Sequence, residues 1–215
     1  MTNRILLAAL LLVFSNACTE DSVSDNASAL IGEWIDCVDA DSTFTFGVDN
    51  SYAYDETCSG EGCEEDHLSG TFEAQAQRLT THAASPEGDI IVQAFSYYAN
   101  ANNLVLGAGY PQGSHDGVVG TWTSQRSTKK NGLELGATEQ TIVLKADQTG
   151  TVTEYLGSSK TFEASGTWGP DLDPENAGGF ELEVTPDGES FTISLSFQLI
   201  DEAVLGSPRF CRVTN

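Results

Sequence analysis

Basic residues are scarce in this sequence, and their scarcity excludes one class of partner. The 215 residues include 9 Lys and Arg but 32 Asp and Glu, which gives a formal net charge of −23. Recognition of nucleic-acid phosphates requires clustered Lys and Arg. We therefore expect no nucleic-acid partner, and an acidic surface that repels anionic lipid headgroups and keeps the protein soluble.

Residue patterns of catalytic and metal sites are also missing from the sequence. The three histidines have no metal-ligand spacing, and no Cys-x-x-Cys pair is present. Residues 114–116 are Ser, His and Asp, but three adjacent residues cannot align a nucleophile, a base and an orienting carboxylate. The acidic segments 39–42 and 171–176 do not match the ligand spacing of an EF-hand. We therefore expect a protein that is not an enzyme and that holds no metal or other cofactor.

Long apolar runs are limited to the N-terminus. Residues 5–14 form an unbroken apolar run of ten residues that follows Arg4. Ten residues rise about 15 Å as a helix, which is too short to span a bilayer. Small residues stand at the −3 and −1 positions of a cleavage site after Ala17. Residues 1–17 are therefore predicted to be a cleaved secretory signal peptide, and no later segment is predicted to form a transmembrane helix.

The residue after the predicted cleavage site, Cys18, is a candidate for lipidation. The segment resembles a bacterial lipoprotein signal, in which a cysteine directly after small residues receives diacylglycerol on its sulfur. Residues 18–29 would then be the lipidated cysteine and a flexible polar tether. The resemblance implies an outer-membrane lipoprotein on the periplasmic or cell-surface face, held to the membrane by its lipid. The alternative is cleavage by signal peptidase I, which leaves a soluble periplasmic or secreted protein.

The chain has five cysteines, an odd number for an exported protein. Lipidation of Cys18 leaves four, which is enough for two disulfides in an oxidising compartment. Cys58 and Cys63 enclose a short loop with two glycines, so we favour the pairs Cys58–Cys63 and Cys37–Cys211. The connectivities 37–58 with 63–211 and 37–63 with 58–211 remain open.

Apolar and polar residues alternate along much of the chain with the period of a β-strand. In residues 191–199 every odd position is apolar and every even position is polar. Residues 180–184 alternate in the same way, and the turn residues Pro186, Asp187 and Gly188 follow them. The pattern predicts an all-β protein in which these two segments form a hairpin.

The two halves of the chain share four short motifs in the same order. The clearest is Gly-x-Trp, which ends the matched segments 30–34 and 118–122. The other matched segments are 48–51 with 146–149, 68–72 with 164–168, and 104–107 with 203–206. The repeat predicts one β-unit at residues 30–113 and a second at residues 118–215.

The repeated motifs resemble those of lipocalin-like domains in bacterial secreted lipoproteins. The resemblance rests on Gly-x-Trp, on the Asp-led turn after the next strand, and on the Ser-Gly-Thr-aromatic strand start. It implies two tandem small antiparallel up-and-down barrels, with Trp34 and Trp122 each closing one end of a barrel. The alternative is one larger barrel or sandwich that is built from the two repeat halves.

The two predicted units differ in their expected capacity for a ligand. The second has enough inward-facing apolar side chains to fill a small barrel, so we expect it to be packed solid. These side chains are Trp122, Trp168, Phe180, Leu182, Val184, Phe191, Ile193, Leu195, Phe197 and Leu199. The first unit is rich in tyrosine, and Tyr97 and Tyr98 are its candidates for contact with a ligand or partner, although cross-strand packing explains them equally well.

Together these features predict an envelope lipoprotein that acts as a non-enzymatic binding or interaction module. Its partner would be an unidentified small molecule or envelope protein. The alternative is a structural component of an outer-membrane or cell-surface assembly.

Overall fold

The protein is all-β in the computed structural model. The structure describes residues 28–37, 40–57, 66–172, 178–186, 189, 191–202, 204–206 and 210–213. In this part of the chain, 16 strands form one continuous antiparallel sheet. The first eight strands are β1 (Gly32–Asp36), β2 (Ser42–Phe46), β3 (Ser51–Glu56), β4 (Asp66–Gln75), β5 (Arg78–Ala84), β6 (Ile90–Ala99), β7 (Asn103–Leu106) and β8 (Tyr110–Pro111). The others are β9 (Gly120–Lys130), β10 (Leu133–Leu144), β11 (Thr149–Leu156), β12 (Ser159–Pro170), β13 (Phe180–Pro186), β14 (Ile193–Ile200), β15 (Val204–Gly206) and β16 (Phe210–Arg212).

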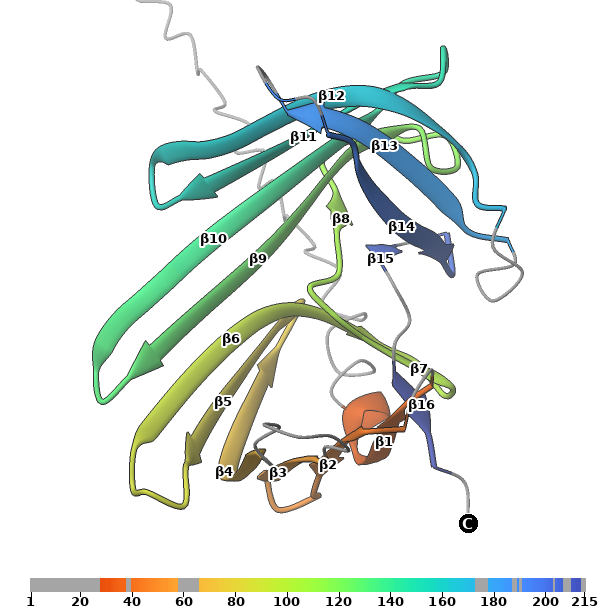
Figure 1. The fold of residues 1–215 in the computed structure, drawn as a ribbon. Coiled ribbons are helices and arrows are strands. Elements are labelled where there is room, and N and C mark those ends of the chain that lie inside the picture. The colour runs from red at the N-terminus through yellow and green to blue at the C-terminus, as the bar shows by residue number, and fades with distance from the viewer. Residues whose placement is uncertain are drawn as a thin grey trace, which may run out of the picture.

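Eight strands, β1 to β7 and β16, close on themselves and form the first barrel. Strands β1 to β6 pair in chain order, β7 pairs with β6, and β16 lies between β7 and β1. Figure 1 shows the blue C-terminal strand β16 beside the orange N-terminal strand β1. The barrel core is rich in aromatic residues, and Trp34, Phe46 and Tyr97 are almost fully buried in it.

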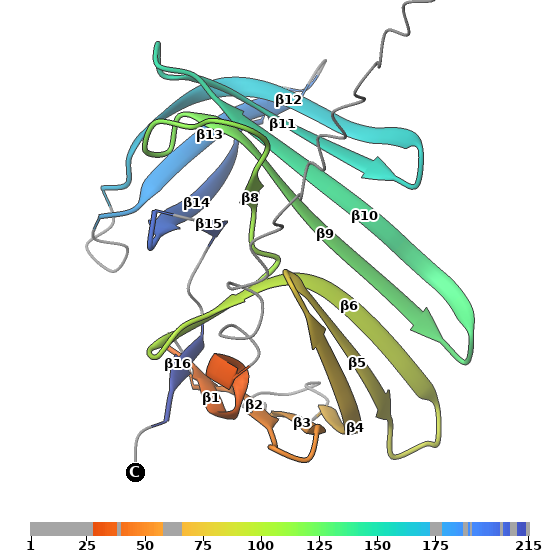
Figure 2. The ribbon, with the colours of Figure 1, turned by 180° about the vertical axis from the view of Figure 1, so that it is seen from behind.

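Strands β8 to β15 form the other curved part of this continuous sheet, which we call the second lobe (Figure 2). Its strands β9 to β15 pair in chain order, and β8 pairs with the start of β9. Gly109, just before β8, and Leu205 of β15 exchange two backbone hydrogen bonds, with N···O distances of 2.7 and 2.8 Å. The lobe joins the first barrel through β9, whose second half pairs with the first half of β6.

The repeated tryptophans have the same environment in both halves. The indole Nε1 of Trp34 donates to the carbonyl of Leu30 at 2.8 Å, and Nε1 of Trp122 donates to the carbonyl of Val118 at 2.9 Å. Both side chains are at most 1% exposed. A buried indole N–H needs an acceptor, and each repeat supplies one four residues earlier in the chain.

The Asp-led turns also match. The backbone N–H of Ser51 donates to the Asp49 carboxylate, and the N–H of Thr149 donates to the Asp147 carboxylate. Hydrogen bonds from the Ser51 and Thr149 side chains, and secondly these backbone bonds, lower the pKa of the two carboxyl groups. The residue inside each turn, Asn50 or Gln148, has a φ close to +64°. Each repeat therefore uses the same local geometry to reverse the chain.

The two halves exchange their last strands. The strand that follows β7 is β8, and it pairs with β9 at the start of the second half. The strand that follows β15 is β16, and it pairs with β1 at the start of the first half. Residues 210–212 were expected within the second unit, and the structure instead places them in the first barrel. A three-residue strand has too little alternation to reveal which sheet it joins.

A disulfide joins Cys37, just after β1, to Cys211 in β16, with a Cα–Cα distance of 5.4 Å. This is the pairing expected from the sequence. The disulfide links the C-terminal strand covalently to the N-terminal strand of the first barrel. Cys18, Cys58 and Cys63 lie outside the described residues.

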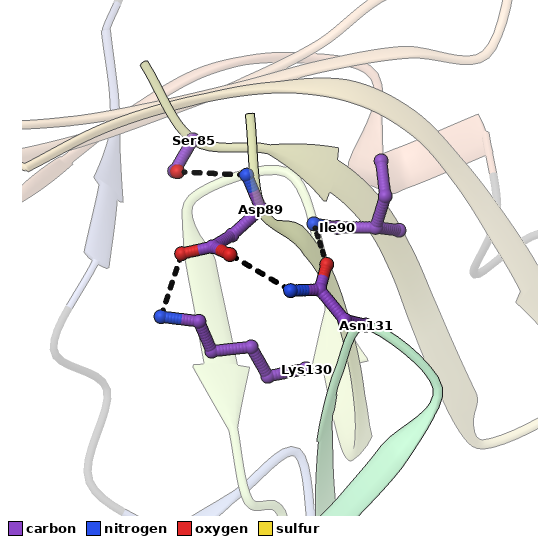
Figure 3. A network of polar contacts seen from close by, with 5 residues as sticks. All are labelled: Ser85, Asp89, Ile90, Lys130 and Asn131. Carbon is purple, nitrogen blue, oxygen red and sulfur yellow. Dashed lines mark hydrogen bonds and ion pairs between the residues drawn. The ribbon is translucent and has the colours of Figure 1, made fainter. Parts of the chain in front are cut away.

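A polar network holds the tip of the β9–β10 hairpin against the first barrel (Figure 3). The Asp89 carboxylate accepts from Lys130 Nζ at 2.7 Å and from Asn131 Nδ2 at 2.8 Å. These two donors lower the pKa of Asp89. The Asn131 side-chain oxygen accepts from the backbone N–H of Ile90 at 2.8 Å. The network fixes the register in which β9 pairs with β6.

Candidate functional site

The second lobe has two adjoining cavities among its strands, and both are partly open to solvent. The first has a volume of about 160 Å³ and lies between β9, β14 and β15. The second has a volume of about 190 Å³ and lies between β11, β12, β13 and β14. Gln140 and Leu195 line both cavities and separate them.

The pairing register explains which side chains face these cavities. Directly opposed residues on neighbouring antiparallel strands share a face of the sheet. Trp122 opposes Ile142, and the next pair on the same face is Ser124 with Gln140. Gln140 in turn opposes Glu154 on β11. A row of three polar side chains therefore crosses the concave face beside the buried Trp122.

Most of the cavity wall is apolar. Trp122, Ile142 and Phe197 line the first cavity, and Val184 and Ile193 line the second. Gln140 Nε2 donates to Glu154 Oε1 at 2.9 Å, so these two polar groups satisfy each other in part. A concave, largely apolar site with a few convergent polar groups is typical of small-ligand binding sites.

The second unit has a packed core with two small, partly open cavities beside it, and its expected lack of ligand capacity stays a prediction. Leu182, Val184 and Phe197 pack in the core as expected, but Phe191 is 53% exposed. The polar row of Ser124, Gln140 and Glu154 interrupts the apolar side chains on this face of the lobe. The two cavities lie beside this row. Part of the signal was present in the sequence, because Gln140 has the same parity as Ile142 and Leu144 of β10, and Glu154 has the same parity as Val152 of β11.

The two candidate tyrosines of the first unit point to opposite faces of β6. Tyr97 is fully buried in the core of the first barrel. Tyr98 donates from its hydroxyl to the Asp201 carboxylate at 2.5 Å, and Asn100 Nδ2 donates to the same oxygen at 2.8 Å. Burial and the Asp201 carboxylate raise the pKa of Tyr98 to about 12. Tyr98 thus links the first barrel to the turn between β14 and β15.

The two candidate barrel-closing tryptophans have different neighbours. Trp34 lies in the core of the first barrel, and the Arg212 guanidinium from β16 lies over its ring. Trp122 lies in the core of the second lobe and forms one wall of the first cavity. Trp122 is therefore the repeated residue that belongs to the site.

Within the described ranges, no three His, Cys, Asp or Glu side chains gather in a position to hold a metal. No helix of the described chain is long and apolar enough to cross a membrane. No family model, curated protein or solved structure matches the chain.

Proposed function

We propose that this protein is an envelope lipoprotein, anchored through Cys18, that acts as a non-enzymatic binding module. The two adjoining cavities of the second lobe, which together we call the hollow, receive an apolar group of its ligand. The observation that carries the proposal is the pair of adjoining apolar cavities, crossed by the polar row Ser124, Gln140 and Glu154.

The proposal includes the lipocalin-like interpretation of the second lobe, in which β8 to β15 form a second small barrel. Its support is the pair of hydrogen bonds between Gly109 and Leu205, which joins the two ends of the lobe. The lobe has the same number of strands as the first barrel and repeats its turns and its buried tryptophan. In the part of the chain that the structure describes, the Gly109 and Leu205 pair alone closes the seam, and the rest of the seam is open to a ligand.

The physical basis for binding is burial of apolar surface. Transfer of apolar area from water contributes about 25 cal/mol per Å². The polar row would also orient a bound ligand, because the Gln140 amide and the Glu154 carboxylate offer a hydrogen-bond donor and acceptors side by side in the hollow. The two cavities together have about 350 Å³, which is at the lower end of the usual volume of ligand pockets, a range that begins at about 300 Å³.

An environment-sensitive apolar dye, N-phenyl-1-naphthylamine, tests the proposal. The chain from residue 18, with Cys18→Ser to keep it soluble, should bind the dye saturably with increased fluorescence. Leu195→Trp fills the wall shared by both cavities and should abolish binding. Leu172→Trp, at a position 90% exposed, is the matched control and should bind like the parent chain.

Two results would contradict this function. One is the absence of saturable dye binding to the parent chain. The other is unchanged binding by Leu195→Trp when circular dichroism shows that the variant is folded. If that variant does not fold, Ser124→Leu provides the same test, because Ser124 lines the first cavity from β9.

A second candidate function, a structural role in an envelope assembly, has its own observation. Ile90, Leu133 and Leu135 are 51%, 70% and 59% exposed, and all lie at the end of the lobe where the β9–β10 hairpin meets β6. Exposed apolar groups of this kind are typical of contacts with another protein. Sedimentation at increasing concentration should show association that Leu133→Ser with Leu135→Ser abolishes, and a parent chain that stays monomeric would count against self-assembly.

A further inference from the structure

Strand β14 occupies the same place in the second half as β6 does in the first. The repeat matches Val105 of β7 with Val204 of β15. Val105 pairs with Tyr98 of β6, and Val204 pairs with Ile200 of β14. Counting back along both strands, residues 91–95 of β6 correspond to residues 193–197 of β14.

These corresponding segments of β6 and β14 differ in how their outer edges are paired. Residues 91–95 of β6 pair with residues 126–130 of β9, and the polar network around Asp89 holds that pairing in place. Residues 193–197 of β14 pair with β13 on one side, and no described residue pairs with their other edge. Among the described residues, the second half therefore has no counterpart of the strand that fills this position in the first half.

The hydrogen-bond pattern of β15 shows which backbone groups point to the open side. Leu205 uses both its N–H and its C=O to bond Gly109, so β15 bonds β14 through Val204 and Gly206. Their partners are Ile200 and Gln198. Successive residues of a strand direct their N–H and C=O to opposite sides. Ser196 and Ser194 therefore direct theirs to the open side.

The open edge faces the hollow of the second lobe. Leu195, Ser196 and Phe197 line the first cavity from β14, and Trp122 and Ser124 line it from β9. A strand added to this edge would alternate its side chains. Every second one would enter the apolar hollow, and the others would lie on the outer face of the sheet.

The outer face beside this edge is acidic. Glu181 and Glu183 of β13 are directly opposite Ser196 and Ser194, and the Ser194 hydroxyl donates to the Glu181 carboxylate. The strand that fills the equivalent position beside β6 has Lys or Arg at three of its five residues, 126, 129 and 130. Acidic neighbours and a chain of net charge −23 favour a basic partner.

We infer that the free edge of β14 binds an extended basic segment of a partner protein by β-strand addition. The inference rests on the proposed function, because the alternate apolar side chains of that segment enter the same hollow. Backbone hydrogen bonds to Ser194 and Ser196 hold the segment, and its Lys or Arg side chains lie near Glu181 and Glu183. A second copy of this acidic chain is disfavoured by like-charge repulsion.

Proline substitution tests the edge without removing the pairing of β14 with β13. Ser196→Pro deletes one N–H on the open side, and edge positions of a strand tolerate proline. Ser196→Ala is the matched control and keeps that N–H. The probe is a fluorescein-labelled capped peptide, Lys-Val-Lys-Val-Lys, and the readout is its anisotropy with the chain from residue 18 carrying Cys18→Ser.

The parent chain and Ser196→Ala should bind this peptide equally, and Ser196→Pro should bind at least about tenfold more weakly. The peptide Glu-Val-Glu-Val-Glu, or the basic peptide with its alternate amides methylated, should bind more weakly to all three chains. Equal binding by the proline and alanine variants, or equal binding of the methylated peptide, would show charge attraction alone and overturn the inference.

The dye N-phenyl-1-naphthylamine separates this inference from the proposed function. If the parent chain binds the dye but not the basic peptide, the hollow remains a ligand site and the peptide inference falls. If it binds neither, both fall. Association of the protein with itself that Ser196→Pro removes would assign the edge to a second copy and would also overturn the inference.

Discussion

The guanidinium of Arg212 lies over the indole of Trp34, with its central carbon 5.0 Å from the ring centroid. The two residues also oppose each other in the pairing of β16 with β1. Arg212 Nη2 donates to the backbone carbonyls of Ala29 and Ile31. A single side chain therefore connects the last strand, β16, to the segment directly before β1.

Removal of that side chain should weaken the whole first barrel. Arg212→Ala loses the cation–π contact and two hydrogen bonds from a charged donor, and we expect the free energy of unfolding to fall by about 1–3 kcal/mol. Urea denaturation followed by tryptophan fluorescence measures the change. Arg126→Ala, which removes an exposed arginine from β9, should change stability by less than about 0.5 kcal/mol. Equal effects of the two variants would contradict this role for Arg212.

The disulfide between Cys37 and β16 should stabilise the fold more than a disulfide that closes a short loop. Cys37 and Cys211 are 174 residues apart, so their bond restricts the unfolded chain strongly. Replacement of both by Ala should lower the free energy of unfolding by about 2–4 kcal/mol in urea denaturation. Replacement of Cys58 and Cys63 by Ala serves as a comparison, and it should cost less because that predicted loop is short. A larger loss from the second pair would be inconsistent with the loop-length argument.

The contact between Tyr98 and Asp201 should make stability depend on pH at the acidic end. Hydrogen bonds from Tyr98 and Asn100 lower the pKa of Asp201 in the folded protein. The folded-state pKa is therefore below the unfolded value of about 4, so the stabilisation is present above that value. It is lost as the pH falls through the folded-state pKa.

Urea denaturation between pH 2 and pH 7 measures this dependence. Asp201→Asn should reduce the fall in stability on acidification relative to the parent chain. Glu202→Gln, which changes the neighbouring carboxylate, should leave the fall unchanged. A parent chain and an Asp201→Asn variant with superimposable pH profiles would rule out a contribution from this contact.

The proposed anchor at Cys18 should determine where the protein is found in the cell. In a bacterial host, the parent protein should sediment with membranes, and Cys18→Ser should move it to the soluble periplasmic fraction. Stable anchoring requires more than one acyl chain, as the lipoprotein modification supplies. Cys58→Ser, which keeps Cys18, should remain with the membranes. A parent protein found only in the soluble fraction would exclude the lipid anchor.

Local features of both repeats were accessible from the sequence because they depend on residues close together in the chain. The Trp34 and Trp122 hydrogen bonds reach back only four residues. The turns at Asp49 and Asp147 bond a backbone N–H only two residues on. The alternation of residues 193–199 likewise identifies a strand with one buried face.

The candidate site was not accessible in the same way. Gln140 and Glu154 could be assigned to the inward face, but only the pairing of three strands places them in one row with Ser124. The volume left beside that row depends on how Leu195, Phe162 and their neighbours pack. Small differences in packing decide whether an interior is filled or hollow.

By itself, the sequence determined an all-β chain with a repeated set of strands, turns and buried tryptophans, because alternation and turn chemistry are local properties of the chain. Only the tertiary structure decided that β8 pairs with β9 of the second half, that β16 pairs with β1 of the first half, and that β9 pairs with the edge of β6. It also left the edge of β14 without a described partner. The reason is that every β-strand presents the same backbone donors and acceptors, so the choice among possible partners depends on packing between residues far apart in the chain.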